Sequence, residues 1–525
     1  MRAGRFFPLL LNLVLASAVV VAAQPASPVP QTPAPLQIEE ATIAQVHAAM
    51  KAGTLTCRGL VDHYLARIAA YDRKGPALNS IVVVNRAAAT EAALLDARFK
   101  QGGLTGPLHC VPVIVKDNLE TIGLQSSAGS LALKGFTSRR DAAVVARMKF
   151  AGAIVLAKSN MAELGLNPLE TVSSLSGATR NPYALDRVPA GSSGGTAVAI
   201  AANFGLVGLG TDTGSSIRGP ASHNALVGIR PTMGLTSRTG LIPLNALSDT
   251  AGPLARTVED AAAVLQVIAG VDPEDAATRA GIGSGVPVYR TSLVASGLQG
   301  ARIGVLRQAY AGGPEGIDAE VDRNFAQALR DMKAAGAEVV DSVHVEQPRP
   351  SPGAEYCQGL KYDLDRYLAQ QGSRVPVHSL EEIIEGGEFD SSIRELLLTE
   401  QDADEDGPGS EACNANAAYR TAVAAALSRA MDDLRLDALV YPTWSQPPQL
   451  ARSVNPQQAG QSLPFATASG FPAITVPMGV TRGVLPSGLS FLGRAWSEST
   501  LIRLACAYEQ ATRHRRPPLT APPLP

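Results

Sequence analysis

Aromatic residues and an excess of positive charge are both scarce in this sequence of 525 residues. Phe, Trp and Tyr together make up 5% of it, and 47 Asp and Glu residues outnumber 45 Lys and Arg residues. Because no basic stripe is present, we do not expect nucleic acid as a partner. Hydrophobic residues reach 46%, and there are 49 glycines. This composition is typical of a large core in which helices pack closely on a sheet.

Cysteine and histidine are also few, and they show no metal-ligand spacing. The chain has five cysteines and seven histidines. The cysteines form no CxxC pair, which disfavours structural zinc, and we expect neither a metal nor a cofactor. An odd number of cysteines leaves at least one free thiol in an oxidising compartment. Cys357 and Cys413 lie in the polar, loop-rich later part of the chain and could form a disulfide.

The N-terminal segment has the pattern of an export signal. Arg2 and Arg5 precede a mostly apolar run at 6–21, and small residues at 21–23 offer a cleavage site before Gln24. The run is shorter than the roughly 20 residues that a membrane span needs, which disfavours the alternative of an uncleaved anchor. The sequence therefore predicts a signal peptide at 1–23, a Pro-rich linker at 24–36, and a mature protein that is periplasmic or secreted without stable membrane insertion.

Short apolar runs alternate with helical patterns along the rest of the chain. This alternation predicts an α/β fold with a large mixed sheet covered by helices on both faces. Two helical patterns occupy 41–71, with Thr56 as a candidate cap of the second. Residues 310–435 are more polar and helical, which predicts a cap or insertion within a single domain at 37–525. The expected strands lie at 108–115, 153–157, 206–209, 303–306, 438–441, 473–477 and 489–492.

Two turns rich in glycine and serine carry the candidate chemistry, GSSGG at 191–195 and GTDTGSSIR at 210–218. Successive backbone N–H groups at Thr213, Gly214 and Ser215 could hold an oxyanion. Ser216 at the end of that turn is a candidate nucleophile, but a serine needs a base to remove its proton. Lys116 ends an apolar strand, and burial would keep its amine neutral enough to act as that base, with Ser192 relaying the proton.

Together these segments resemble the amidase signature family. The resemblance rests on both turns, on PVIVKDN at 112–118, on GFPAITVP at 470–477 and on the 24-residue separation of Ser192 and Ser216. It extends from about residue 40 to the end, with a signature core at about 75–300. It implies the amidase signature fold and a Ser-Ser-Lys triad formed by Lys116, Ser192 and Ser216.

The family pattern also implies roles for the surrounding residues. Ser192 would follow a cis peptide bond, and Ser193 would support the hydrogen-bond network of the triad without contacting the substrate. Asp212 and Arg218 would form a structural ion pair that fixes the loop, and the backbone of 213–215 would supply the oxyanion hole. Ser215 and Ala190 depart from the pattern, because many relatives have glycine at both positions. A backbone donor survives either change, and a side chain would be harmful only where φ must be positive.

Other interpretations of the same segments are weaker. GxSxG at 191–195 could make Ser193 the nucleophile of an α/β-hydrolase elbow with a distant histidine, but no buried strand is expected at 183–190. The segment at 152–159 nearly matches a phosphate loop, with Ala157 in place of the required glycine. The acidic segment that starts at Asp402 begins like a calcium loop, but Cys413 replaces its final glutamate.

The sequence thus predicts an enzyme that hydrolyses a carboxamide bond in a small molecule or peptide through an acyl-enzyme, as a monomer or homodimer. RAWSE at 494–498 and YEQ at 508–510 look similar to exported bacterial peptide amidases. Three alternatives stay open: the glutamine-amidase subunit of a tRNA-dependent amidotransferase, an esterase or urethane hydrolase, and an inactive amide-binding protein. The export signal argues against the first, and the presence of the lysine and both serines argues against the last.

Overall fold

The computed structural model describes residues 36–524 except for 311–315, 342, 404–406 and 463, and of residues 1–35 it describes only 1, 4 and 8. The predicted signal peptide and nearly all of the predicted linker therefore lie outside the described residues. Among the described helices, none is long and apolar enough to cross a membrane.

The described strands form one mixed sheet in the order β1-β3-β2-β4-β6-β5-β10-β11-β9-β7-β8. This confirms the predicted α/β fold. The central strands are buried on both faces, and parallel pairing joins β2 to β3 and to β4. The strands are β1 (Ile81–Val84), β2 (Pro112–Lys116), β3 (Ile154–Ser159), β4 (Val207–Asp212), β5 (Val227–Arg230), β6 (Thr250–Ala255), β7 (Arg302–Val305), β8 (Glu338–Val340), β9 (Ala438–Pro442), β10 (Ala473–Thr481) and β11 (Leu485–Leu492).

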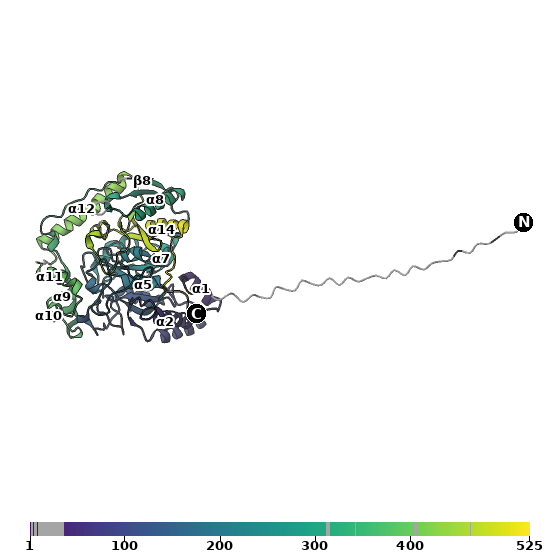
Figure 1. The fold of residues 1–525 in the computed structure, drawn as a ribbon, viewed down its shortest axis with the longest axis horizontal. Coiled ribbons are helices and arrows are strands. Elements are labelled where there is room, and N and C mark those ends of the chain that lie inside the picture. Colours follow the sequence, from purple (N-terminus) through teal and green to yellow (C-terminus); the bar gives the residue numbers. More distant parts are fainter. Residues whose placement is uncertain are drawn as a thin grey trace. The chain divides into compact units, whose positions relative to one another are not determined.

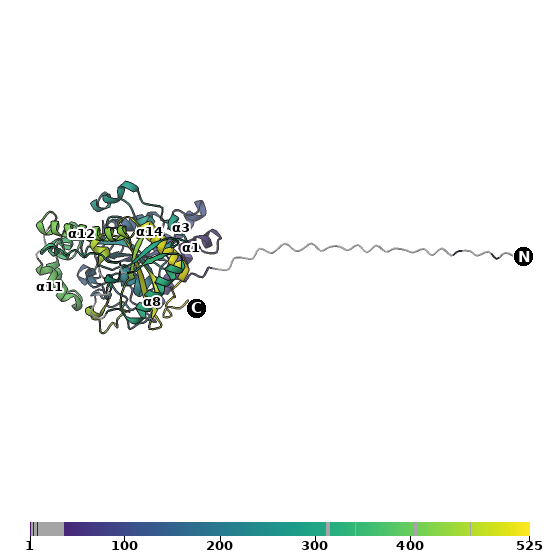
Figure 2. The same ribbon diagram turned by 90° about the horizontal axis from the view of Figure 1, so that it is seen from above.

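Helices cover both faces of this sheet (Figures 1 and 2). Thr56 caps the second helix as predicted, because its side chain accepts a hydrogen bond from the backbone of Gly59. The α-helices are α1 (Ile43–Lys51), α2 (Cys57–Tyr71), α3 (Ala88–Gly102), α4 (Ala143–Phe150), α5 (Gly194–Ala201), α6 (Arg218–His223), α7 (Val258–Ile268), α8 (Ala319–Ala334), α9 (Leu360–Gln371), α10 (Leu380–Gly386), α11 (Arg394–Asp402), α12 (Glu411–Asp433), α13 (Phe465–Ser469) and α14 (Glu498–Thr512).

A row of glycines lets α5 and α6 approach the sheet. A Cβ at Gly208 would lie 2.5 Å from Thr196 of α5, and a Cβ at Gly228 would lie 2.7 Å from Ala221 of α6. No real side chain tolerates contacts that short. The two helices that begin at the glycine and serine turns are therefore held directly against the central strands.

The predicted insertion at about 310–435 contains two different parts. Helix α8 packs on the sheet, and β8 pairs with β7 at its edge, so the segment up to residue 340 belongs to the sheet layers. Helices α9, α10 and α11 lie together at one side of the fold (Figure 1) and share a separate apolar cluster with loops at 128–136 and 161–164. These loops follow β2 and β3, so the three helices lie beyond the carboxyl ends of those strands.

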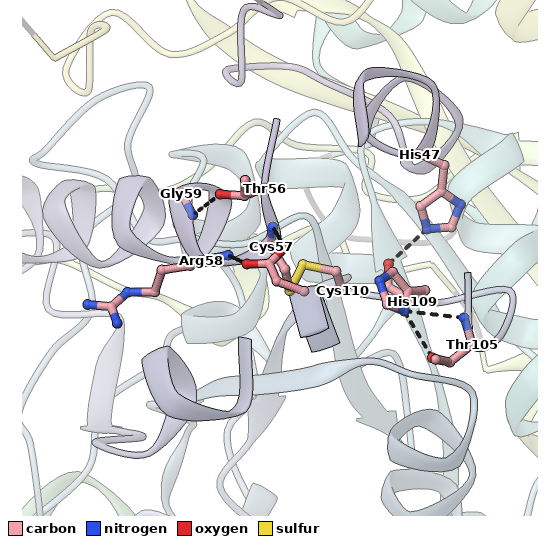
Figure 3. The surroundings of a disulfide bond; sticks show 9 residues. His47, Thr56, Cys57, Arg58, Gly59, Thr105, His109 and Cys110 are labelled. Carbon is pink, nitrogen blue, oxygen red and sulfur yellow. Dashed lines mark hydrogen bonds between the residues drawn. A yellow bond between two sulfur atoms is a disulfide. The ribbon is translucent and has the colours of Figure 1, made fainter. Parts of the chain in front are cut away.

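Two disulfides link segments that are distant in the sequence of the described chain. Cys357 pairs with Cys413, as the sequence allowed, and joins the segment before α9 to the start of α12. Cys57 pairs with Cys110, which the sequence did not indicate, and joins the first residue of α2 to the segment before β2 (Figure 3). Cys506 is free and buried. The expected unpaired thiol is therefore in α14.

Candidate active site

Three chain segments meet at one edge of the sheet. Lys116 ends β2, Asp212 ends the neighbouring parallel strand β4, and Ser192 lies in the turn that leads into α5. Because the carboxyl ends of parallel neighbours lie at the same edge, these residues come together although 76 positions separate Lys116 from Ser192. The turn at 213–217 then joins β4 to α6.

Lys116 lies at the centre of this group. Its Nζ is 2.8 Å from Ser192 Oγ and also donates a hydrogen bond of 2.8 Å to Thr211 Oγ1. Lys116 is fully buried and forms none of the salt bridges found in the described part of the chain. Burial lowers the pKa of Lys116 to about 7, since desolvation outweighs the attraction of Asp249 and Asp212. A large share of its amine is therefore neutral near pH 7.

The backbone around Ser192 is fixed by close packing. A cis peptide bond joins Gly191 to Ser192, as the family pattern implies. A Cβ at Gly191 would lie 2.3 Å from the Asn167 carbonyl oxygen, so only glycine fits there. Ser193 Oγ donates to the Thr211 carbonyl at 3.0 Å and accepts from the Thr211 N–H at 3.3 Å. The turn is thereby tied to the end of β4, next to Lys116.

Ser216 is buried beside this turn. Its carbonyl accepts a hydrogen bond of 3.2 Å from the Ser193 N–H, which holds the two turns together. Within the described part of the chain its hydroxyl forms no hydrogen bond, so the structure does not close the link from Ser216 Oγ to Ser192 Oγ. A Cβ at Gly214 would meet no atom within 4 Å, so there is open space next to the predicted oxyanion turn.

A buried cluster of charged side chains stabilises the turn at 213–217. Asp212 Oδ2 lies 3.2 Å from Arg218 Nε, and Asp212 Oδ1 lies 2.9 Å from Arg230 Nη1. Burial would raise the pKa of Asp212, but the two guanidiniums hold it well below its usual range. Asp212 Oδ2 also accepts from the Ile217 N–H at 3.1 Å. The predicted pair of Asp212 and Arg218 is therefore present, with Arg230 as an additional partner.

Comparison with known proteins agrees with this geometry. A family model described as Amidase matches residues 59–502. The chain belongs to the amidase family. The protein is accordingly an amide hydrolase, with the fold of that family.

Solved structures and curated sequences of this family resemble the chain over most of its length. The structure of native peptide amidase from Stenotrophomonas maltophilia is 40% identical, with a TM-score of 0.83, and the match covers 92% of this chain and 99% of that one. The structure of peptide amidase PAM with the competitive inhibitor chymostatin has a TM-score of 0.84 at 40% identity and covers 92% and 100%. A glutamyl-tRNA(Gln) amidotransferase subunit from Symbiobacterium thermophilum is 33% identical and covers 91% and 98%.

Several residues of the amidase site gave no signal in the sequence. Thr211 binds the lysine amine, Arg230 binds Asp212, and Asp249 accepts a hydrogen bond from the Thr213 hydroxyl. Gln461 Nε2 donates to Ser215 Oγ at 2.7 Å from a distant loop. Pairing of β4 with β6 and of β5 with β6 brings Asp249 and Arg230 to the turns, whereas Gln461 reaches Ser215 from the loop after β9. The one available hint was that Arg230 is a charged residue at the end of an apolar segment.

The structure bears directly on the alternative interpretations. Residues 183–190 contain no strand, so Ser193 does not lie on an elbow after a buried strand. Ile154–Ser159 forms β3, which excludes a phosphate loop there. Residues 404–406 of the proposed calcium loop lie outside the described residues, and Cys413 is bound in a disulfide. Ser215 does not have a positive φ, but Ala190 does, at 61°.

Proposed function

We propose that this amidase hydrolyses primary amides of peptides, with Lys116, Ser192 and Ser216 as its catalytic triad. The observation that carries this proposal is the contact of 2.8 Å between a fully buried lysine amine and Ser192 Oγ. A neutral amine can accept a proton, whereas a charged one cannot. The similarity to two peptide amidase structures supports the substrate class.

The proposed reaction has two halves. Ser216 Oγ attacks the amide carbon while its proton passes to Ser192 and the proton of Ser192 passes to Lys116. The hydrogen bond between the two serines forms when substrate binds. The electron pair of the carbonyl moves to its oxygen, which the backbone N–H groups of 213–215 bind. The carbonyl then re-forms, the C–N bond breaks, and the leaving amine takes the proton from Lys116 through Ser192. Water releases the acid by the same route.

Labelling and substrate turnover test this proposal. A fluorophosphonate should form an adduct on Ser216, located by peptide mapping, and Lys116→Met should slow labelling by at least about a thousandfold at pH 7. Lys158→Met is the matched control, since Lys158 is also fully buried but bonds the Leu119 carbonyl at 2.7 Å. An adduct on Ser193, or undiminished labelling of Lys116→Met, would reject the triad.

Ammonia release decides the substrate class. We expect faster release from peptide amides than from free glutamine or aryl amides. Preference for glutamine would favour a role like that of the amidotransferase protein to which the chain is also similar. Faster turnover of matched esters or urethanes would favour the ester or urethane hydrolase instead.

We further propose that the protein is exported. The N-terminal sequence has the pattern of a signal peptide, and two disulfides suit an oxidising compartment. Mass spectrometry of the mature protein from its natural host should find Gln24 at the N-terminus. A chain that retains Met1 or Arg2 would contradict cleavage.

A further inference from the structure

Asp249 is a buried carboxylate that neither the family pattern nor the sequence singled out. It directly precedes β6, and in the antiparallel pair of β4 and β6 Asp212 lies opposite Thr250. The next residues outward, Thr213 and Asp249, continue this register. Strand pairing therefore fixes Asp249 against the first residue of the predicted oxyanion turn.

The hydrogen bonds of Asp249 all come from residues near that turn. Asp249 Oδ1 accepts from the Thr213 hydroxyl. Asp249 Oδ2 accepts from the Leu244 N–H at 2.9 Å and from the Asn245 N–H at 3.1 Å. A carboxylate with three donors is held firmly in one place. Asp249 thus ties the oxyanion turn to the loop at 244–249.

The charge of Asp249 is also less compensated than that of its neighbour. Asp212 lies between Arg218 and Arg230, whereas Asp249 belongs to none of the salt bridges found among the described residues. Arg238 attracts Asp249 electrostatically but forms its salt bridge with Asp275. Burial raises the pKa of Asp249, whereas its three hydrogen bonds and the charge of Lys116 favour the ionised carboxylate. In that ionised form Asp249 is a nearby negative charge that no salt bridge among the described residues compensates and that acts on the amine of Lys116.

We propose that Asp249 is a positioning residue of the reaction: it holds Thr213 in the oxyanion turn and stabilises the positive charge that Lys116 acquires when it takes the serine proton. This inference rests on the proposed triad. Asp249 transfers no proton itself. It provides the counter-charge that an aspartate gives to the histidine of other serine hydrolases, but it acts across a gap rather than through a direct contact.

The negative charge of Asp249 affects the pKa of Lys116 in one direction. The acidic groups that act on Lys116 are Asp249 and Asp212, and both raise its pKa against the effect of burial. Arg218 and Arg230 face Asp212, while the Lys158 and Asp117 pair occupies the adjacent strand ends. Removal of the Asp249 charge should therefore lower the pKa of Lys116 further. The lysine would stay neutral to lower pH but would hold the transferred proton less well.

The rate of fluorophosphonate labelling of Ser216 as a function of pH tests this inference. In Asp249→Asn, which keeps the shape and one acceptor, the acid limb should move roughly one unit to lower pH, and the plateau rate should fall about tenfold. Asp249→Glu keeps the charge and should leave the acid limb within a few tenths of its original place. Asp275→Asn removes another carboxylate facing Arg238 and should not move it.

The outcomes separate the two proposals. If Ser216 of the unaltered protein takes no label, the triad is wrong and the role of Asp249 falls with it. If Ser216 is labelled but the acid limb of Asp249→Asn stays in place or moves to higher pH, the triad stands and the role of Asp249 is rejected. Should Asp249→Asn fail to fold, an acid limb in Asp249→Glu displaced by a full unit to lower pH would also reject it.

Discussion

At the residue scale, two buried charged groups beside the same turns reach opposite states. Asp212 stays ionised because two guanidiniums compensate the cost of burial. Lys116 has hydroxyl and carbonyl neighbours but no contacting carboxylate, so burial pushes it toward the neutral form. The neutral form of Lys116 could be predicted from the sequence, because this lysine ends an apolar strand. The ionised form of Asp212 depends in addition on Arg230, which comes from a different strand.

Ala190 and Ser215 should respond in opposite ways to glycine. Ala190 has a φ of 61°, where a side chain costs about 1 kcal/mol or more, and Ser215 does not have a positive φ. Ala190→Gly should therefore leave the free energy of unfolding unchanged or raise it by up to about 1 kcal/mol. Ser215→Gly should lower it by about 1 kcal/mol, because it adds backbone freedom and removes the hydrogen bond from Gln461.

Urea denaturation of both variants checks this pair of predictions, with the m-value confirming an unchanged folding unit. A loss of more than about 1 kcal/mol in Ala190→Gly would show that the Ala190 methyl group contributes packing that outweighs its strained backbone.

At the element scale, short apolar runs predicted most of the strands, but β1, β5, β6 and β8 were missed. The segments at β2, β3, β4, β7, β9, β10 and β11 were all expected, although their ends differ by a few residues. Of the missed strands, β1 (IVVV) and β8 (EVV) are short strands of four and three residues, and β5 (VGIR) and β6 (TAGPLA) contain glycine or proline within the sheet. A Cβ at Gly252 of β6 would lie 2.1 Å from the Ile229 carbonyl oxygen, so glycine is required where these strands approach. In β5 and β6 the small residues interrupt the apolar run by which a strand is predicted.

The disulfide between Cys57 and Cys110 should contribute strongly to stability. It closes a segment of 53 residues and joins α2 to the start of β2, so in the chain-entropy account its loss should cost about 4 kcal/mol. Cys57→Ser combined with Cys110→Ser should lower the unfolding free energy by that order, without removing Lys116 from its strand.

Thiol counting checks the pairing itself. The unreduced, denatured chain should take up one alkyl group, on Cys506, and the reduced chain should take up five. Three groups on the unreduced chain would mean that one of the two disulfides is absent from the protein in solution.

At the scale of the whole molecule, the order of the strands in the sheet brings the residues of the site together. The motifs predicted Lys116, Ser192 and Ser216 because each ends or follows a recognisable element. Asp249, Arg230 and Gln461 reach the turns only through pairing of β4 with β6, of β5 with β6, and through a loop after β9. Such long-range contacts leave no local pattern, and a single sequence cannot reveal them. The disulfide of Cys57 escaped prediction for the same reason.

The central claim, a lysine amine that is neutral near physiological pH, can be measured without any substrate. In protein labelled with ¹³C at lysine Cε, one resonance should titrate near pH 7 and disappear in Lys116→Met. A second should titrate near pH 8 and disappear in Lys158→Met, because burial also lowers the pKa of Lys158 to about 8. If the Lys116 resonance instead titrates near pH 10, as an ordinary lysine does, the amine is charged at neutral pH and cannot be the base.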